Sequence, residues 1–416
     1  MIIITVILGI YAGVGTAYWL WMAYGAVRLW REVPKLDEAK PMAPGSRPRV
    51  SVVVPACNEA DKVEAAFRTL MQQDYPELEL ILVDDRSTDE TGLIADRLGA
   101  EDVRVRVIHI SELPQGWLGK LHAMDRGYAA STGEYVLFTD ADVHFGPGAI
   151  EKAAAYAVEN KLDHLTVIPH LWSAGILTDA IVCSFLRPFM VMLARPWKVS
   201  DAKSRAFMGV GAFNMVRREA FARTEGLAWL RMEVGDDMAL GFMMKRSGAR
   251  CGVAKGLDEV GLVWHRTVRE ALRGSEKGYA PVCQFSVWRG AVAGTALAAV
   301  EMSPMILLMG IFSTQWRVFG LMGIVLTMVA LAAMVMMARW AKGSVLAAVV
   351  SPVGTIIGAW AMLRAGVLGR RRGGIVWRGT RYTSEELRKG MRLNLRLSGK
   401  IEDKTTGKNG DGRGKA

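Results

Sequence analysis

Two aspartates stand at the end of one strongly apolar segment. Residues 135–143 begin with β-forming residues and then present Asp140 and Asp142, one residue apart. In open α/β sheets ligands bind at the carboxyl ends of strands, and carboxylate oxygens suit Mg²⁺ or Mn²⁺ shared with a phosphorylated substrate. The pair therefore predicts a divalent-cation site, with a helix-capping turn before Pro147 as the alternative.

Polar residues also end two earlier apolar segments. Asn58 and Glu59 follow the first segment, and Asp84 and Asp85 end the second. Because parallel strands bring their carboxyl ends to one edge of a sheet, we expect these side chains to line one site, where Asp84 or Asp85 accepts hydrogen bonds from a base or ribose. A Ser/Thr/Asp capping turn is the alternative for the second cluster.

Two glycine-containing loops could approach a substrate closely. Residues 116–122 contain two glycines and Lys120, which could meet a diphosphate as a point charge or be an exposed loop lysine. Gly209 and Gly211 precede Asn214, and paired glycines let the backbone approach a sugar or an acceptor. A tight turn before the next helix is the alternative for this second loop.

Two adjacent acids, Asp236 and Asp237, come just before an amphipathic helical segment. At a helix N-terminus they could cap the backbone and complement the helix dipole. A carboxylate there could also take a proton from a substrate hydroxyl within hydrogen-bond reach. The residues alone leave both roles open.

These residues are placed by a regular alternation of strand-like and helical segments from Val50 to about residue 168. Such alternation predicts an α/β fold with a mostly parallel, doubly wound sheet that is covered on both faces. The glycine-rich fingerprint of dinucleotide-binding folds is absent between the first strand and the first helix, so a nucleotide would be held in another way.

Composition indicates a membrane surface as partner. The chain has 416 residues, 51% of them hydrophobic, and a formal net charge of +11. The apolar excess lies at the two ends, and a basic chain with apolar ends favours an anionic membrane over nucleic acid. The four cysteines show neither metal-binding nor disulfide spacing, which fits a cytoplasmic setting for the middle of the chain.

The apolar runs predict membrane helices at both ends. Residues 2–27 are long enough to span a bilayer, and basic residues follow but do not precede them, so we expect the N-terminus outside and the next segment in the cytoplasm. Three spans from the C-terminal runs 291–312, 318–338 and 344–363 would leave the basic tail outside. We therefore expect the first run, which contains Glu301, to be interfacial or re-entrant.

Two other segments are expected at the lipid surface. Residues 176–199 are apolar but interrupted by arginines and prolines, which favours a helix in the membrane plane, with a buried core helix as the alternative. Residues 377–382 are interpreted as an interfacial anchor, ahead of a Gly/Lys/Asp-rich tail that we expect to be disordered.

Taken in order, six motifs resemble the family 2 glycosyltransferases, which are inverting enzymes with a GT-A nucleotide-sugar fold. The motifs are P-A-C-N-E from Pro55, V-D-D-R-S-T-D-E-T from Val83, G-K-L-H-A-M-D-R-G from Gly119, T-D-A-D from Thr139, G-V-G-A-F-N-M-V-R-R-E-A-F from Gly209 and E-V-G-D-D-M-A-L-G from Glu233. The membrane layout is most similar to that of the enzymes that glycosylate lipids, namely the ceramide, carotenoid and hopanoid-associated group.

The resemblance implies roles for the acidic residues. Asp84 or Asp85 would contact the uridine of a UDP-sugar, Asp142 would hold the metal on the diphosphate with Asp140 beside it, and Asp237 would be the general base next to Asp236. The other expected contacts are Asn58, Glu59, Lys120 and Asp140 to the donor, and Gly209, Gly211 and Asn214 to the acceptor.

One motif departs from the family pattern. Processive members carry a QxxRW signature after the base, but here Gln284 and Trp288 are kept and Val287 stands in place of the arginine. This change favours single-sugar transfer and leaves the donor-side cation unassigned. Arg289 is a candidate, and an upstream basic helix face that includes Lys277 could meet donor phosphates, lipid head groups or solvent.

The expected layout has four parts: a transmembrane anchor and the start of a linker (1–34), a cytoplasmic GT-A domain (48–290), membrane helices (291–364) and a basic interfacial segment with a disordered tail (365–416). We expect an integral protein of the cell inner membrane that moves one sugar from a nucleotide-diphosphate sugar to a lipid hydroxyl with Mg²⁺ or Mn²⁺. The alternatives are a processive polysaccharide synthase and a non-catalytic membrane protein that binds nucleotide or lipid.

Overall fold

The computed structural model describes residues 2–43 and 45–393, and its centre is one eight-stranded sheet with the order β3-β2-β1-β4-β7-β6-β8-β5. Six strands run parallel to one another, while β7 and β5 run opposite to their neighbours. The strands are β1 (Val50–Ala56), β2 (Leu78–Asp85), β3 (Val105–Ile110), β4 (Tyr135–Phe138), β5 (His144–Phe145), β6 (His164–Leu171), β7 (Asn214–Arg217) and β8 (Cys251–Leu262). The prediction of a mostly parallel α/β sheet is confirmed.

Helices cover both faces of this sheet. In β2, Leu80 and Leu82 point into one apolar cluster and Ile81 and Val83 into another, as the two-residue period of a strand requires. The first face is covered by α2 (Val63–Met71), α3 (Thr91–Glu101) and α5 (Ala149–Glu159), and the second by α4 (Gly119–Ala130), α7 (Arg218–Ala222), α8 (Gly226–Leu230) and α9 (Asp236–Arg246). Burial on both sides explains why the central strands are almost continuously apolar.

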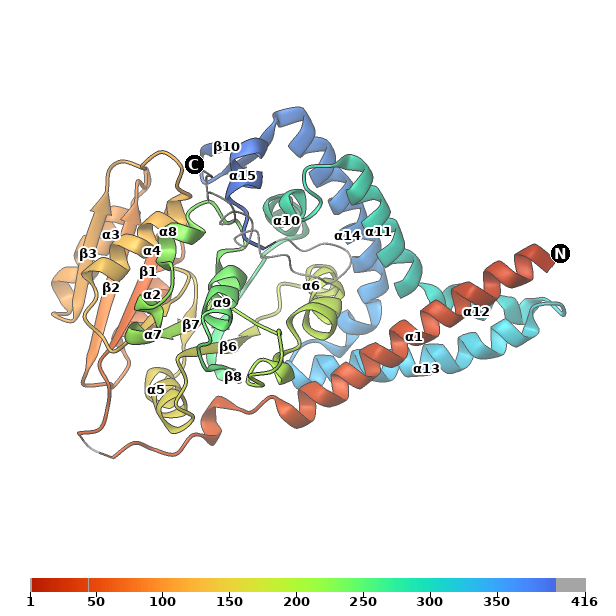
Figure 1. Ribbon diagram of the computed structural model, residues 1–416, viewed down its shortest axis with the longest axis horizontal. Helices are drawn as coiled ribbons and strands as arrows, with labels where there is room; N and C mark the ends of the chain where they lie inside the picture. Colours follow the sequence, from red (N-terminus) through yellow and green to blue (C-terminus); the bar gives the residue numbers. More distant parts are fainter. Residues whose placement is uncertain (1, 44, 394–416) are drawn as a thin grey trace, which may run out of the picture.

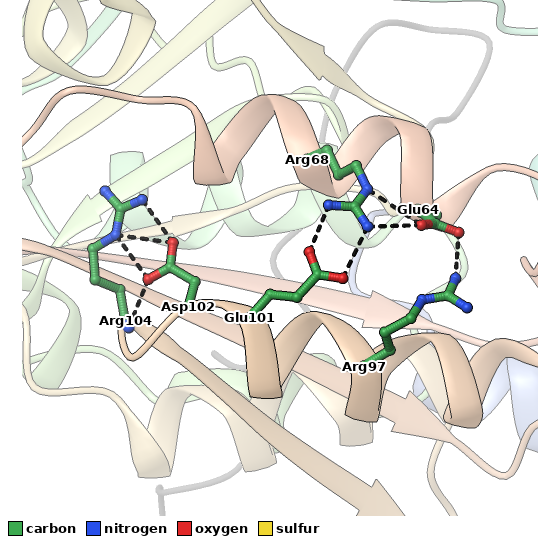
Figure 2. A network of polar contacts seen from close by, with 6 residues as sticks. All are labelled: Glu64, Arg68, Arg97, Glu101, Asp102 and Arg104. Carbon is green, nitrogen blue, oxygen red and sulfur yellow. Dashed lines mark hydrogen bonds and ion pairs between the residues drawn. The ribbon is translucent and has the colours of Figure 1, made fainter.

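Helices α2 and α3 are joined on their outer surface by a network of ion pairs (Figure 2). Arg68 contacts Glu64 at 2.9 Å and Glu101 at 2.6 Å, and Arg97 contacts Glu64 at 2.5 Å. These side chains are solvent-accessible, so the network fixes the relative position of the helices more than it adds to stability. Asp102 and Arg104 form a separate pair at the end of α3, next to the amino end of β3.

Long helices extend away from the sheet, and α1 (Ile2–Glu32) lies beside α13 (Arg317–Trp340) on the right of Figure 1. Within the described residues four helical segments are long and apolar enough to cross a membrane: Ile2–Glu32, Ile176–Lys198, Arg317–Trp340 and Val345–Arg372. A fifth candidate, α11 (Val287–Glu301) with the helix Ser303–Phe312, is bent by 53°. This bend agrees in shape with the interruption predicted at Glu301. Residues 176–198, for which an in-plane helix was predicted, are long and apolar enough to cross a membrane, although their α-helix ends at Pro188 and shorter helical turns follow.

Small residues bring the membrane-type helices into close contact. A Cβ atom on Gly354 of α14 (Val345–Arg372) would lie 2.4 Å from the carbonyl oxygen of Ala180 in α6 (Ile176–Pro188). A Cβ on Gly294 of α11 would lie 2.9 Å from the carbonyl oxygen of Ala359 in α14. Such backbone contacts are typical of helix packing in membranes, where apolar burial alone does not drive association.

One ion pair is buried among these helices. Arg187 of α6 binds Glu301 of α11 and donates a 2.9 Å hydrogen bond to Ser351 of α14, while the Tyr18 hydroxyl of α1 also binds Glu301. Arg187 is 3% exposed and Glu301 is 1% exposed. Glu301, the charged residue inside an apolar run of the sequence, is therefore part of a polar network that connects four helices. This network holds the helices together beside the sheet.

The chain after α14 returns to the sheet domain (Figure 1). Strands β9 (Gly374–Trp377) and β10 (Thr380–Thr383) form a hairpin, followed by α15 (Ser384–Gly390). Tyr382 and Leu387 are buried in the apolar cluster that contains α4, α8 and α9. Residues 377–382 therefore form a hairpin that packs on the sheet domain, and their interpretation as an interfacial anchor stays a prediction. The expected disordered tail from residue 394 lies outside the described residues.

Candidate functional site

The sheet brings three polar strand ends together. β1 pairs in parallel with β2 on one side and with β4 on the other, so the residues that follow these strands share one edge. Asn58 connects two of the ends, because its side-chain oxygen accepts a 2.8 Å hydrogen bond from the Thr88 N–H and its own N–H donates to Ser87 at 3.0 Å. Asn58 thus shapes the edge, and its expected donor contact stays a prediction.

The first acidic pair of this edge faces inward. Asp85 is 1% exposed, and both its oxygens accept hydrogen bonds from Arg86, at 2.8 and 2.9 Å. One oxygen of Asp84 lies 3.0 Å from Nδ1 of His109, while Oδ1 is buried and makes no hydrogen bond within the described residues. A Cβ on Gly119 would lie 2.3 Å from Asp85, so α4 needs glycine at its first residue. The chain thus keeps a paired carboxylate directly beneath the start of α4.

Lys120 lies at the centre of the site. Its ammonium is 2.7 Å from Asp140 and 2.8 Å from Asp236, and its side chain is 12% exposed. Burial opposes the charged form, but attraction by Asp140 and Asp236 outweighs it and raises the pKa of Lys120. The structure thus places Lys120 between two carboxylates and not as an exposed loop lysine, and its expected contact with a diphosphate stays a prediction.

Asp140 and Asp142 differ in their surroundings. Burial would raise the pKa of Asp140, but Lys120 lowers it below the ordinary value. The pKa of Asp142 is raised by burial and then by the charge of Asp140, and its closest cation is Lys62 at 3.5 Å. Glu59 lies on the other side of Lys62, at 3.6 Å, and burial raises its pKa too.

This donor set fits a divalent ion that is shared with a substrate. Within residues 2–43 and 45–393 no group of three or more His, Cys, Asp or Glu side chains is arranged to hold a metal by itself. Asp142, 26% exposed and under-compensated in charge, could supply one carboxylate, with Asp140 beside it. Mg²⁺ and Mn²⁺ sites of this kind use one or two carboxylates and take their remaining ligands from phosphate oxygens and water.

Asp237 is held at the N-terminus of α9. Its Oδ2 accepts a 3.1 Å hydrogen bond from the Gly211 N–H, and Oδ1 accepts one from the Met238 N–H at 2.8 Å. Burial, and then the adjacent charge of Asp236, raise the pKa of Asp237 to about 6. A carboxylate with this pKa is suited to accept a proton near neutral pH, and its cap-like hydrogen bond does not exclude that role.

The glycines of the second loop allow the acids to approach each other. A Cβ on Gly209 would lie 1.8 Å from the carbonyl oxygen of Asp237, and one on Gly211 would lie 2.5 Å from Asp140 Oδ2. The Gly211 carbonyl also accepts a 3.0 Å hydrogen bond from the Asp140 N–H. Gly211 therefore links the end of β4 to the start of α9 through both of its backbone groups.

Asn214 has a different position from the predicted acceptor contact. It is 2% exposed, donates a 3.1 Å hydrogen bond to the Asp237 carbonyl and places Oδ1 2.5 Å from Nε2 of His164. Burial lowers the pKa of His164 to about 4, so the ring is neutral and can donate to Asn214. Asn214 orients α9 from the core, and His164, which the sequence did not single out, supports it.

The sequence also missed the C-terminal contribution to the site. Arg378, in the turn of the hairpin, donates a 3.2 Å hydrogen bond to Glu59, and the Tyr382 hydroxyl accepts one from the Gly119 N–H at 3.4 Å. The sequence offered one usable signal, since an Arg-Gly pair between two short β-type segments is compatible with a tight hairpin.

Comparisons with known proteins concern the part of the chain that forms the sheet. Residues 51–224 match the family described as Glycosyl transferase family 2. The uncharacterized glycosyltransferase YibD of Escherichia coli is 33% identical over 178 residues, which are 42% of this chain and 50% of that protein. A Campylobacter jejuni protein named GalNAc(5)-diNAcBac-PP-undecaprenol beta-1,3-glucosyltransferase is 32% identical over 103 residues, which are 25% of this chain and 32% of that protein.

A solved structure extends the likeness in fold. The mannosyltransferase PcManGT from Pyrobaculum calidifontis, in complex with GDP-Man and Mn²⁺, superposes with a TM-score of 0.53 over 87% of this chain and 98% of that one, at 20% sequence identity. The two curated relatives are matched over half of their length or less. Residues 51–224 are therefore similar to the Glycosyl transferase family 2, and they lie in a mostly parallel α/β fold of the GT-A type.

Proposed function

We propose that this chain is an inverting glycosyltransferase that moves one sugar from a nucleoside-diphosphate sugar to the hydroxyl of a membrane lipid, with its sheet domain on the cytoplasmic side of the inner membrane. One observation carries the proposal. Lys120 joins Asp140 to Asp236, and Gly211 joins Asp140 to Asp237, so the expected diphosphate end and the expected base belong to one connected cluster.

The residues of the cluster divide the reaction between them. Asp237 takes the proton of the acceptor hydroxyl, whose oxygen then forms a bond to the anomeric carbon. The bond from that carbon to the diphosphate oxygen breaks on the opposite face, and the nucleoside diphosphate leaves with the electron pair. Lys120 keeps Asp140 and Asp236 in place while charge moves between donor and acceptor. A divalent ion bound at Asp142 would neutralise the charge of the leaving diphosphate.

Removal of divalent ions tests the metal part of the proposal. We expect EDTA to lower turnover by at least about tenfold and to weaken nucleoside-diphosphate binding, and Mn²⁺ or Mg²⁺ to restore both. Isothermal titration of the nucleoside diphosphate gives a readout that does not depend on turnover. Unchanged binding and turnover after exhaustive chelation would contradict a metal at Asp142.

The raised pKa of Asp237 predicts the pH dependence of turnover. The base acts when it is deprotonated, so the rate should rise with pH and level off above about 6, the pKa of Asp237. Below that value the rate should fall about tenfold per pH unit. Nucleoside-diphosphate binding measured over the same range distinguishes loss of the base from loss of the donor site, and a flat profile between pH 5 and 7 would argue against Asp237.

The membrane-type helices support a lipid acceptor. The segment Ile176–Lys198 and α14 pack together beside the sheet, and both are long and apolar enough to cross a membrane. A lipid hydroxyl could thus reach the site from the bilayer without leaving it. The name of the Campylobacter relative includes an undecaprenol-linked acceptor, which is compatible with this direction of approach.

A donor panel tests the function directly. The purified protein in lipid vesicles is incubated with labelled nucleotide sugars, and the lipid extract is analysed by mass. We expect one donor to add the mass of one sugar to one lipid class. A ladder of additions would instead indicate a polysaccharide synthase, and the absence of any product with all donors and lipid extracts would favour a non-catalytic binding protein.

A further inference from the structure

The C-terminal hairpin reaches the edge of the sheet where the donor is proposed to bind. Its two-residue turn, Arg378 and Gly379, has φ angles of 48° and 77°, the left-handed values that a tight type I′ hairpin needs. Tyr382 is 6% exposed, and its hydroxyl accepts the Gly119 N–H at 3.4 Å, directly above the buried Asp85. The turn is therefore fixed beside the polar strand ends, although Tyr382 and Gly119 are 263 positions apart in the chain.

A second attachment holds the segment that follows the hairpin. Glu233, which is 3% exposed, accepts backbone hydrogen bonds from Arg392 at 2.5 Å and from Leu393 at 3.0 Å. A Cβ on Gly390 would lie 2.1 Å from Cβ of Met232, so α15 ends in close contact with the same loop. Glu233 stands three residues before Asp236. The C-terminal segment is thus attached to the loop beside Lys120 through Tyr382 and to the loop before Asp236 through Glu233.

Arg378 points from the turn into a cavity. The cavity measures about 440 Å³ and is lined by Cys57, Asn58, Glu59, Asp61, Lys62, Arg266, Glu270 and Arg378. The Arg378 side chain is 26% exposed, and its guanidinium donates to Glu59 at 3.2 Å. Lys62 connects the same Glu59 to Asp142, so Arg378 and the expected metal ligand lie at one end of the site.

A second cation lies next to the turn. Lys277 of α10 (Val268–Val282) places its ammonium 5.0 Å from the centroid of the Trp377 ring. Lys277 is exposed, but desolvation by the surrounding protein and then the charge of Lys120 lower its pKa. Cations gathered in this way repel one another, and a bound anion would relieve that repulsion.

The position where processive relatives carry an arginine cannot supply this cation. Val287 is the first residue of α11, and the helix contact with α14 is so close there that a Cβ on Gly366 would lie 3.0 Å from the Val287 Cα. Arg289, on the first turn of α11, is exposed, and neither Arg289 nor Lys277 lines the cavity. Lys277 is the better candidate because it interacts electrostatically with Lys120, Asp140 and Arg378 of the site.

We propose that Arg378 and Lys277 bind the diphosphate of the donor, so that the C-terminal hairpin supplies the cation that the degenerate QxxRW segment lacks. The inference rests on the proposed function. In the bound state the planar guanidinium of Arg378 exchanges its contact with Glu59 for two hydrogen bonds to phosphate oxygens, and Lys277 acts as a point charge on the leaving group. The hairpin also covers the diphosphate from the side opposite the sheet.

The test compares two arginines of the same hairpin. Arg378→Gln should raise the Kd of UDP or GDP, whichever the wild type binds, by about tenfold or more. Arg381→Gln is the matched control, since Arg381 is exposed and donates to the Arg372 carbonyl rather than into the cavity, and should change Kd by less than about twofold. Lys277→Met should raise Kd by a smaller factor than Arg378→Gln, and thermal unfolding of each variant confirms that it is folded.

The outcomes separate this inference from the function on which it rests. Equal Kd values for Arg378→Gln and Arg381→Gln, with sugar transfer intact in the wild type, would overturn the hairpin's role and leave the glycosyltransferase proposal standing. A wild type that binds neither nucleoside diphosphate and transfers no sugar would overturn both. If Arg378→Gln proved unfolded, Arg378→Lys decides instead, because it keeps the charge but loses the planar fork and should still weaken binding.

Discussion

Replacing Asp237 by Asn is expected to lower sugar transfer by about 10²- to 10⁴-fold, the contribution typical of a general base, while nucleoside-diphosphate binding stays within about twofold of the wild type. The side chain keeps its size, but it can no longer accept the acceptor proton. Folding should survive, because burial and the charge of Asp236 raise the pKa of Asp237 to about 6, which means that its charge, although present at neutral pH, is less favourable in the folded than in the unfolded state.

Asp102→Asn is the matched control for this experiment. Asp102 pairs with Arg104 at 2.7 Å beside the amino end of β3 (Figure 2), whereas the site lies at the carboxyl ends of the parallel strands. This variant should leave turnover unchanged. Substantial transfer by Asp237→Asn, at more than about a tenth of the wild-type rate, would remove Asp237 from the base role and direct attention to Asp236.

The acidic residues of the site could be predicted from sequence because they stand where periodic patterns stop. Asp84, Asp140 and Asp236 each mark a boundary between an apolar strand or loop and the next turn or helix. The parallel pairing of β1 with β2 and β4 then brings these boundaries together, which a βα alternation already implies.

The directions of individual side chains could not be predicted in this way. Sequence did not reveal that Lys120 would join two carboxylates or that Asn214 would be buried against His164, and their expected substrate contacts stay predictions. Their orientation depends on the close approach of the loop at Gly209 to α9. This is a long-range contact, and local sequence periodicity carries no information about it.

The contacts that span the chain were the least accessible to sequence. Glu301 was recognisable as a charge inside an apolar run, but its partner Arg187 lies 114 residues earlier in a different helix. The aromatic and basic residues at 377–382 suited a membrane interface equally well by composition. Their attachment to the loop before α4 becomes evident only when α14 turns the chain back towards the sheet (Figure 1).

Replacing Lys120 by Met is expected to destabilise the sheet domain and to stop turnover together. The substitution leaves Asp140 and Asp236 without the ammonium that lies 2.7 and 2.8 Å from them. Removal of one partner from a buried ion pair costs about 3–5 kcal/mol, and the lower end applies here because the Asp140 side chain is 35% exposed and partly screened by water. Lys389→Met, at an exposed pair with Glu385, should leave the melting temperature unchanged.

The pH dependence of this loss identifies its cause. In the wild type Lys120 holds the pKa of Asp140 below its ordinary value, so that contribution to stability is present above the pKa of the unfolded state and is lost as the pH falls through the folded-state pKa. The difference in melting temperature between Lys120→Met and the wild type should thus be largest at neutral pH and shrink in acid. The double variant Lys120→Met/Asp236→Asn should regain part of the stability without regaining turnover. A melting curve of Lys120→Met equal to that of the wild type at pH 7 would mean that the two carboxylates do not depend on Lys120, and the connected cluster proposed for catalysis would lose its link.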